Sequence, residues 1–111
     1  MTRDLQLVCQ HESCLSATTN IADIFSASRR RTYFVEDQGR FVDDYFSFDF
    51  DLDELRTIRR RQRSPVRDPN YDDLLSLATV DEYLAVVAGA GRPVGVYVET
   101  KDPTYTNGRP R

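Results

Sequence analysis

The sequence predicts an α/β fold in which helices separate parallel strands. One strand is expected near residues 93–99, where valines recur at every second position, and a shorter one near residues 5–9, which are mostly apolar. Helices are expected near residues 52–62 and 80–90, because a capping box precedes each of them. The order strand, long insertion, helix, loop, helix, strand is typical of an alternating α/β layout with a parallel sheet.

The composition indicates a globular chain and excludes several classes of function. With 111 residues the chain forms at most one domain, and its formal net charge of -3 argues against a general nucleic-acid binder. No apolar run approaches the roughly 18 residues of a membrane span, so we expect no transmembrane segment. The opening residues do not have the pattern of a secretory signal peptide. Cys9, Cys14 and a single histidine cannot supply four zinc ligands, and we expect both thiols to be reduced.

The first expected strand, residues 5–9, leads into the only histidine of the chain. His11 lies two residues after Cys9 and shares its face if the strand continues. The next segment, residues 13–20, is rich in serine and threonine and predicts a loop. A lone histidine is more often structural or exposed than catalytic, and these residues alone leave both interpretations open.

The segment 21–50 shows no sustained helical or strand period, so we expect a long irregular insertion. It mixes aromatic residues with charged ones. The run Arg29–Arg31 is compatible with a phosphate or nucleic-acid patch, but four acidic residues lie close by: Glu36, Asp37, Asp43 and Asp44. The interpretation that we favour is a solvated, partly self-paired insertion that leans on another part of the protein.

The first expected helix begins after Asp51, which forms a capping box with Glu54. Acidic residues fall in its first turn and Arg59–Arg61 in its last, which suits the helix dipole. These arginines are therefore expected at a solvated helix end. Pro65 ends the helix, and residues 67–70 predict a turn.

The second expected helix begins after Thr79, which forms a capping box with Glu82. Its buried stripe is expected to consist of Leu84, Val87 and Ala88. Gly89 and Gly91 end it, and the chain then enters the second strand.

That strand places two kinds of side chain on opposite faces. One face is wholly apolar, with Val94, Val96 and Val98. The other begins with Gly95 and ends with Glu99 and Lys101, the only lysine of the chain. In parallel α/β folds functional groups gather at the C-terminal ends of strands, which makes Glu99 and Lys101 candidate site residues. An edge strand with a solvated Glu/Lys pair is the alternative.

Taken together, these pieces resemble the glycerophosphodiester phosphodiesterase family, and the resemblance covers residues 2 to 103. The matching blocks stand in the family's order: Leu7-Val8-Cys9-Gln10-His11-Glu12, Thr18-Thr19-Asn20-Ile21-Ala22-Asp23, Phe50-Asp51-Leu52-Asp53-Glu54-Leu55, Arg67-Asp68-Pro69, Ala78-Thr79-Val80-Asp81-Glu82-Tyr83 and Val94-Gly95-Val96-Tyr97-Val98-Glu99-Thr100-Lys101-Asp102-Pro103. The order and spacing are similar to the branch of the family with a long insertion after the histidine loop.

The resemblance implies a partial TIM barrel and a phosphodiesterase that needs a divalent cation, calcium or magnesium. Such an enzyme hydrolyses a glycerophosphodiester substrate to glycerol 3-phosphate and an alcohol. His11 matches the family's second histidine, the proton donor to the leaving alcohol. Glu99 matches a carboxylate ligand of the metal, and Lys101 matches the lysine near the substrate phosphate.

The chain also departs from the family pattern. A histidine-arginine pair and a Glu-x-Asp metal pair are expected before residue 1, the rest of the barrel is expected after residue 103, and Glu12 stands where the family usually has aspartate. We therefore expect an internal fragment, a truncated gene model or a decayed copy, inactive by itself. A non-catalytic interaction module is the alternative. An arginine-rich nucleic-acid binder is a third, which the net negative charge disfavours.

Overall fold

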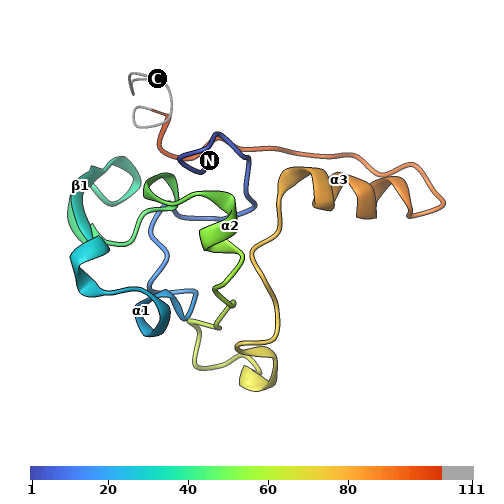
Figure 1. Ribbon diagram of the computed structural model, residues 1–111. Helices are drawn as coiled ribbons and strands as arrows, with labels where there is room; N and C mark the ends of the chain where they lie inside the picture. Colours follow the sequence, from blue (N-terminus) through green and yellow to red (C-terminus); the bar gives the residue numbers. More distant parts are fainter. Residues whose placement is uncertain (104–111) are drawn as a thin grey trace.

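A computed structural model describes residues 1–103 and shows a small mixture of helices and one sheet (Figure 1). The helices are α1 (Ile21–Ile24), α2 (Leu52–Leu55) and α3 (Val80–Ala88), and the strands are β1 (Arg31–Val35) and β2 (Arg40–Asp44). Four single-turn 3-10 helices span Ala27–Arg29, Glu36–Gln38, Ser47–Asp49 and Pro69–Tyr71. The α/β class is confirmed at this coarse level, whereas a partial barrel is not shown.

The strands β1 and β2 form an antiparallel hairpin inside the segment that we expected to be irregular. Arg31 pairs with Asp44 at one end of the ladder and Val35 with Arg40 at the other. The turn between them contains Gly39, whose positive φ of 61° suits a residue without a side chain. One face of the hairpin packs on aromatic residues: Tyr33 lies edge-on against Phe46 at 4.9 Å between ring centroids, whereas Phe41, which points the other way along β2, is 71% exposed. The expectation of an irregular insertion was therefore wrong for residues 31–44.

Two apolar clusters form the core around this hairpin. The larger one surrounds Phe50 and consists of Leu15, Ile21, Tyr45, Phe50, Leu55, Ile58 and Leu77. The smaller one lies under the hairpin and consists of Cys14, Val35, Phe46 and Phe48. Both cysteines are free, as expected, and burial raises the pKa of the Cys14 thiol to about 12.

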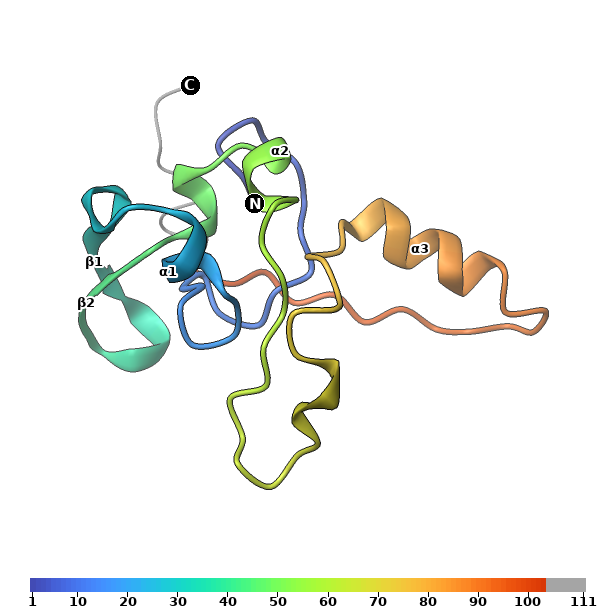
Figure 2. The same cartoon turned by 60° about the horizontal axis from the view of Figure 1, so that its bottom comes forward.

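The two expected parallel strands are not present among residues 1–103. Residues 5–9 make only one antiparallel bridge, between Val8 and Thr79, and Leu5 has a positive φ of 66° that interrupts an extended chain. Residues 93–99 run back beside α3 without pairing to any described strand (Figure 2). A strand is stabilised by the backbone hydrogen bonds of a neighbour, and no described segment offers them along these residues. The expected parallel sheet was therefore wrong for this chain.

The helix expected over residues 52–62 ends at Leu55. Arg56 follows it in a turn, and the later arginines, Arg59–Arg61, are not helical. Their backbone groups bond to distant partners instead of continuing the helix. The Arg59 N–H donates to the Asn20 side chain at 2.6 Å, and the Arg60 N–H donates to the Leu75 carbonyl at 2.7 Å. These tertiary hydrogen bonds, together with the burial of Ile58, outweigh the helical propensity of the segment.

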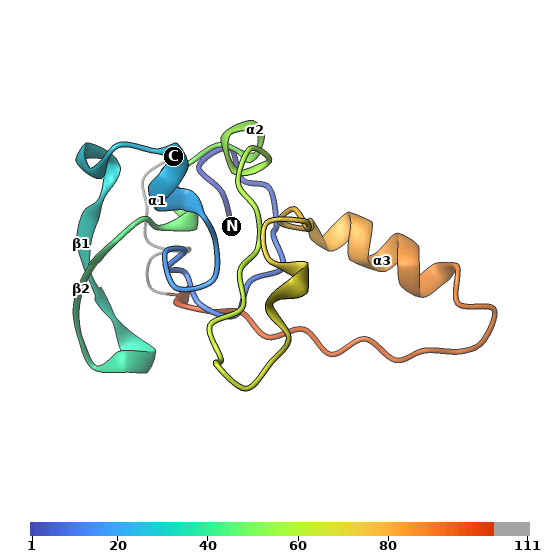
Figure 3. The same ribbon diagram turned by 90° about the horizontal axis from the view of Figure 1, so that it is seen from below.

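Helix α3 begins and ends close to the expected residues, and its capping box is confirmed. The Thr79 N–H donates to Glu82 at 2.8 Å, and the Glu82 N–H donates back to the Thr79 hydroxyl at 3.2 Å. The expected buried stripe was wrong, however, because none of the nine helical residues is buried. Figure 3 shows α3 projecting away from the rest of the molecule. We call residues 80–98 the arm and residues 1–79 the compact region.

Two arginines of the run in the insertion, Arg29 and Arg30, are paired with acidic residues, in keeping with the expected partly self-paired insertion. Arg30 forms an ion pair with Asp43 at 3.0 Å, across the base of the hairpin. Arg29 reaches Glu54 of α2 at 2.9 Å and stacks over the Phe50 ring at 4.3 Å, so it ties the insertion to the larger core. No helix among residues 1–103 is long and apolar enough to cross a membrane.

Candidate functional site

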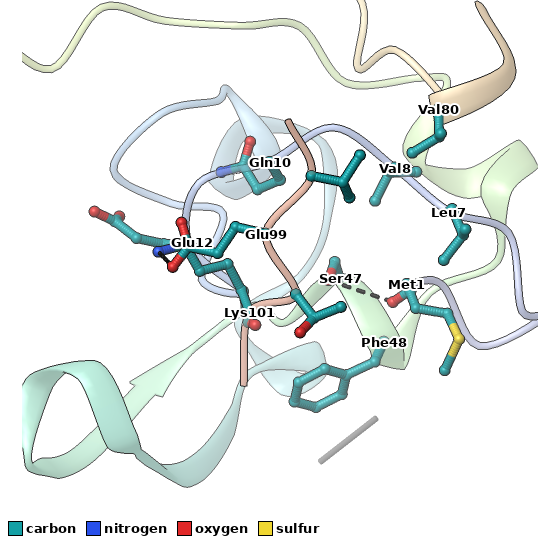
Figure 4. A pocket seen from close by; sticks show the side chains of 13 residues that line it. Met1, Leu7, Val8, Gln10, Glu12, Ser47, Phe48, Val80, Glu99 and Lys101 are labelled. Atoms are coloured by element: carbon teal, nitrogen blue, oxygen red, sulfur yellow. Dashed lines mark hydrogen bonds and ion pairs between the residues drawn. The ribbon is translucent and has the colours of Figure 1, made fainter. Parts of the chain in front are cut away.

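The arm returns to the compact region beside the histidine loop, and a cavity of about 280 Å³ lies where they meet (Figure 4). We call it the Lys101 cavity. Part of its lining comes from the returning segment, with Val98, Glu99 and Lys101, and another part from the histidine loop region, with Leu7 and Glu12. The two predicted residues that follow the arm therefore reach the loop that carries the predicted histidine.

The Glu99 and Lys101 side chains bind each other at the mouth of this cavity. The Lys101 ammonium donates to Glu99 Oε1 at 2.7 Å and lies 3.8 Å from Asp37 Oδ2 of the hairpin turn. The hydrogen bond with Glu99 is the main reason why the pKa of Lys101 is raised, and Lys101 is the main reason why the pKa of Glu99 is lowered. Both groups therefore stay charged at neutral pH. The alternative that the sequence left open was an edge strand with such a pair; the structure shows the Glu99–Lys101 pair but no strand at these residues.

His11 stands at the mouth of a second cavity of about 480 Å³, between the histidine loop and the β1–β2 hairpin. We call it the hairpin cavity. The imidazole is 73% exposed, and its Nδ1 lies 3.6 Å from Glu12 Oε1. The positive charge that His11 can carry contributes, after Lys101, to lowering the pKa of Glu99. The structure thus brings the three predicted site residues into one neighbourhood, although they lie at opposite ends of the sequence.

Glu12 is the residue of this neighbourhood that the sequence argument did not place in the site. Its carboxylate lines both cavities and accepts a hydrogen bond from the Arg63 guanidinium. Arg63 belongs to the extended chain after α2, where the sequence predicted only a helix end. The sequence signal was its position directly after His11, which we noted as a departure from the family pattern.

Two further contacts fix the histidine loop. The Arg60 guanidinium donates to the Cys9 carbonyl and to the Gln10 side chain, which are the two residues before His11. Burial lowers the pKa of Arg60, in keeping with its place beneath the loop. On the other side, the Ser13 hydroxyl donates to the buried Asp102 carboxylate at 2.5 Å. The loop is therefore held both by the compact region and by the segment that carries Lys101.

The residues present do not by themselves fit a hard divalent cation. Calcium takes six to eight oxygen ligands, and magnesium needs six in a nearly octahedral arrangement. Glu99 supplies a single carboxylate, 61% exposed, and the ammonium of Lys101 already holds one of its oxygens. Among residues 1–103 no group of three histidine, cysteine or acidic side chains lies close enough together to hold a metal ion.

One relative among curated proteins bears on the family resemblance of this chain. The chain matches no family model. It is 40% identical over 107 residues to glycerophosphodiester phosphodiesterase GDPD6 of Arabidopsis thaliana, and the match covers 96% of this chain. The chain spans 28% of the length of that relative. The resemblance to the glycerophosphodiester phosphodiesterase family is thereby shown, and it extends over nearly the whole of this chain.

Proposed function

We propose that this chain forms part of the active site of a phosphodiesterase that hydrolyses glycerophosphodiesters to glycerol 3-phosphate and an alcohol. The observation that carries the proposal is the meeting of His11, Glu99 and Lys101 beside two adjoining cavities. A pure scaffold has no need to bring an imidazole, a carboxylate and an ammonium together at one surface. The name of the Arabidopsis relative supports the same reaction.

In this proposal His11 gives a proton to the leaving alcohol. The alkoxide that leaves a phosphodiester is a poor leaving group, and a positioned acid lowers the barrier by protonating it as the P–O bond breaks. His11 is exposed at the mouth of the hairpin cavity, so a substrate can reach its ring.

Lys101 serves as a fixed positive charge for the substrate phosphate. Its raised pKa keeps the ammonium charged at neutral pH, and its side chain is only 20% exposed, which limits competition from water. A phosphate oxygen in the Lys101 cavity would take the place that Glu99 Oε1 holds now. That exchange would free Glu99 for another cation.

Glu99 is proposed as one ligand of the divalent cation, calcium or magnesium, that the family resemblance implies. When bound, such a cation would neutralise charge on the phosphate. Residues 1–103 do not complete its coordination, so further oxygen ligands would have to come from outside these residues. We therefore propose that the 111 residues alone are inactive.

A non-catalytic interaction module is the second candidate. The unburied arm favours it, because none of its side chains is buried against the compact region. The two candidates differ in what His11 does: it is dispensable for a module and essential for hydrolysis.

The test is an assay of phosphodiester hydrolysis on two proteins. The 111-residue chain with added calcium or magnesium should show no turnover. A chimera, in which the Arabidopsis relative supplies the flanking segments, should hydrolyse a glycerophosphodiester. There His11→Ala should lower the rate about a hundredfold or more, the usual range for a general acid.

Matched variants of the chimera separate the roles. Glu99→Ala should mainly weaken activation by the metal, Lys101→Ala should slow the reaction with little effect on metal binding, and Arg67→Ala, on the exposed turn, should change neither. One result would contradict the proposed inactivity of the 111-residue chain: metal-dependent hydrolysis by this chain that is lost in His11→Ala. In that case Glu12 or Asp4 would complete the site. A chimera that is active regardless of His11 would overturn the proposed role.

A further inference from the structure

Glu12 lines both cavities. The position of its carboxylate is set by contacts with Arg63 and His11. Its side chain is 23% exposed, compared with 73% for His11, so the carboxylate is the less mobile partner of the pair. Oxygen Oε1 accepts the hydrogen bond from Arg63 and also faces the Nδ1 atom of His11 at 3.6 Å. One carboxylate oxygen therefore joins an arginine from the compact region to the predicted proton donor.

The contact distinguishes the two nitrogens of the imidazole. Because the carboxylate faces Nδ1, Nε2 is the nitrogen left for a molecule in the cavity. A carboxylate beside Nδ1 favours the form that carries hydrogen there, since a negative oxygen accepts a hydrogen bond but cannot donate one. The 3.6 Å separation is within ion-pair range and slightly longer than a hydrogen bond, so a small rotation of the exposed ring closes it.

We propose that Glu12 and Arg63 are positioning residues that hold His11 with Nε2 toward the substrate. Arg63 keeps the carboxylate in place and prevents it from turning to the ammonium of Lys101, which lines the same cavity as Glu12. The inference rests on the proposed function, because it assigns to Nε2 the proton that the leaving alcohol receives. In that step water forms the new bond to phosphorus and releases a proton to the solvent, the P–O bond to the alcohol breaks with its electron pair on oxygen, and the Nε2 proton moves to that oxygen. The ring is left neutral with its hydrogen on Nδ1.

The inference can be tested on the 111-residue chain without catalysis, because His11 is the only histidine. Nitrogen-15 NMR of the histidine-labelled chain at about pH 9, where an ordinary histidine of pKa about 6.5 is neutral, reports which ring nitrogen carries the hydrogen. The native chain should hold it mainly on Nδ1. In Glu12→Ala the ratio of the Nδ1–H to the Nε2–H form should fall about threefold to fivefold, the size expected for the net contribution of one hydrogen bond.

Variants at two arginines form the matched comparison. Arg63→Met should lower the same ratio, and Arg63→Lys should restore part of it, because an ammonium can still bind the Glu12 carboxylate. Arg67→Met, on the exposed turn nearby, should leave the ratio unchanged. An unchanged ratio in Glu12→Ala, or an equal fall in Arg67→Met, overturns the inference. If the backbone spectrum shows that Glu12→Ala has lost its fold, Glu12→Gln, which keeps the size of the side chain, decides instead.

Failure of this inference differs from failure of the proposed function. If hydrolysis by the chimera requires His11, but neither its rate nor the NMR ratio changes in Glu12→Ala, only the positioning role is wrong. If the NMR ratio follows Glu12 and Arg63 but no chimera hydrolyses a glycerophosphodiester, the proposed function is wrong and the contact stands as a property of the loop.

Discussion

The arm contains the larger proportion of apolar residues, but only the compact region buries apolar side chains. In the compact region Phe46, Phe50 and Leu15 are at most 1% exposed, and the ion pairs of Arg29 lie over this core. In the arm Val86 is 75% exposed and Tyr97 is 95% exposed. Since burial of apolar area is the dominant favourable term in folding, the compact region carries the stability of the chain.

Helix α3 forms in spite of this exposure because its N-terminus is fixed. A helix of nine residues is marginal in water without tertiary packing. Its N-terminus is held by the Thr79 capping box, which is a local contact, and by the ion pair between Arg56 of the compact region and Glu82 at 2.8 Å. The comparison teaches that contacts at one end are enough to give the arm a helix, but not enough to seat that helix on a core.

The largest expected effect contrasts a core residue with an arm residue. Phe50→Ala should destabilise the chain by about 3–5 kcal/mol, because the ring packs against Phe25 at 5.0 Å and leaves a cavity when it is removed. Val86→Ala should change the free energy of unfolding by less than about 0.5 kcal/mol. Urea unfolding of both variants measures the difference. Similar losses in the two would show that the arm is packed in solution.

An intermediate effect is expected from the helix cap. Thr79→Ala should destabilise α3 by about 1 kcal/mol, because the Glu82 N–H loses its acceptor. Amide exchange should become faster within residues 80–88 and stay unchanged around Phe50. Equal acceleration in both regions would mean that the arm and the compact region unfold together, which the difference in burial argues against.

The smallest effect is expected on acidification. The pKa of Glu54 is lowered chiefly by its hydrogen bond from Arg29, and that of Glu82 chiefly by the Thr79 N–H. A folded-state pKa below the unfolded value, about 4.3 for glutamate, adds stability above that value and loses it as the pH falls through the folded pKa.

Urea unfolding should therefore have a lower midpoint at about pH 3 than at about pH 6. Glu54→Gln should reduce this pH dependence in the compact region, and Glu82→Gln should reduce it in the helical signal of the arm. Stability that rises on acidification would contradict both assignments.

The candidate site was only partly predictable. The sequence predicted His11, Glu99 and Lys101 as site residues through the family resemblance of the motifs around them, and in the structure these residues line two cavities that share Glu12. It did not identify Glu12 as their link, because the contact depends on Arg63, which reaches Glu12 only when the chain after α2 leaves the helix. The roles of all these residues stay predictions until the assays are made.

Interactions within a few residues of each other were determined by the sequence alone. The capping box of Thr79 and Glu82, the turn at Asp68 and the end of α3 before Gly89 follow from contacts that span two to four residues. The tertiary structure alone decided the pairing of β1 with β2, the early end of α2 and the exposure of α3. Each of these depends on which distant groups are available to accept a hydrogen bond or cover an apolar face. The chain after Leu55 is the clearest case, because Asn20 and Leu75 take the hydrogen bonds that a longer helix would have kept for itself.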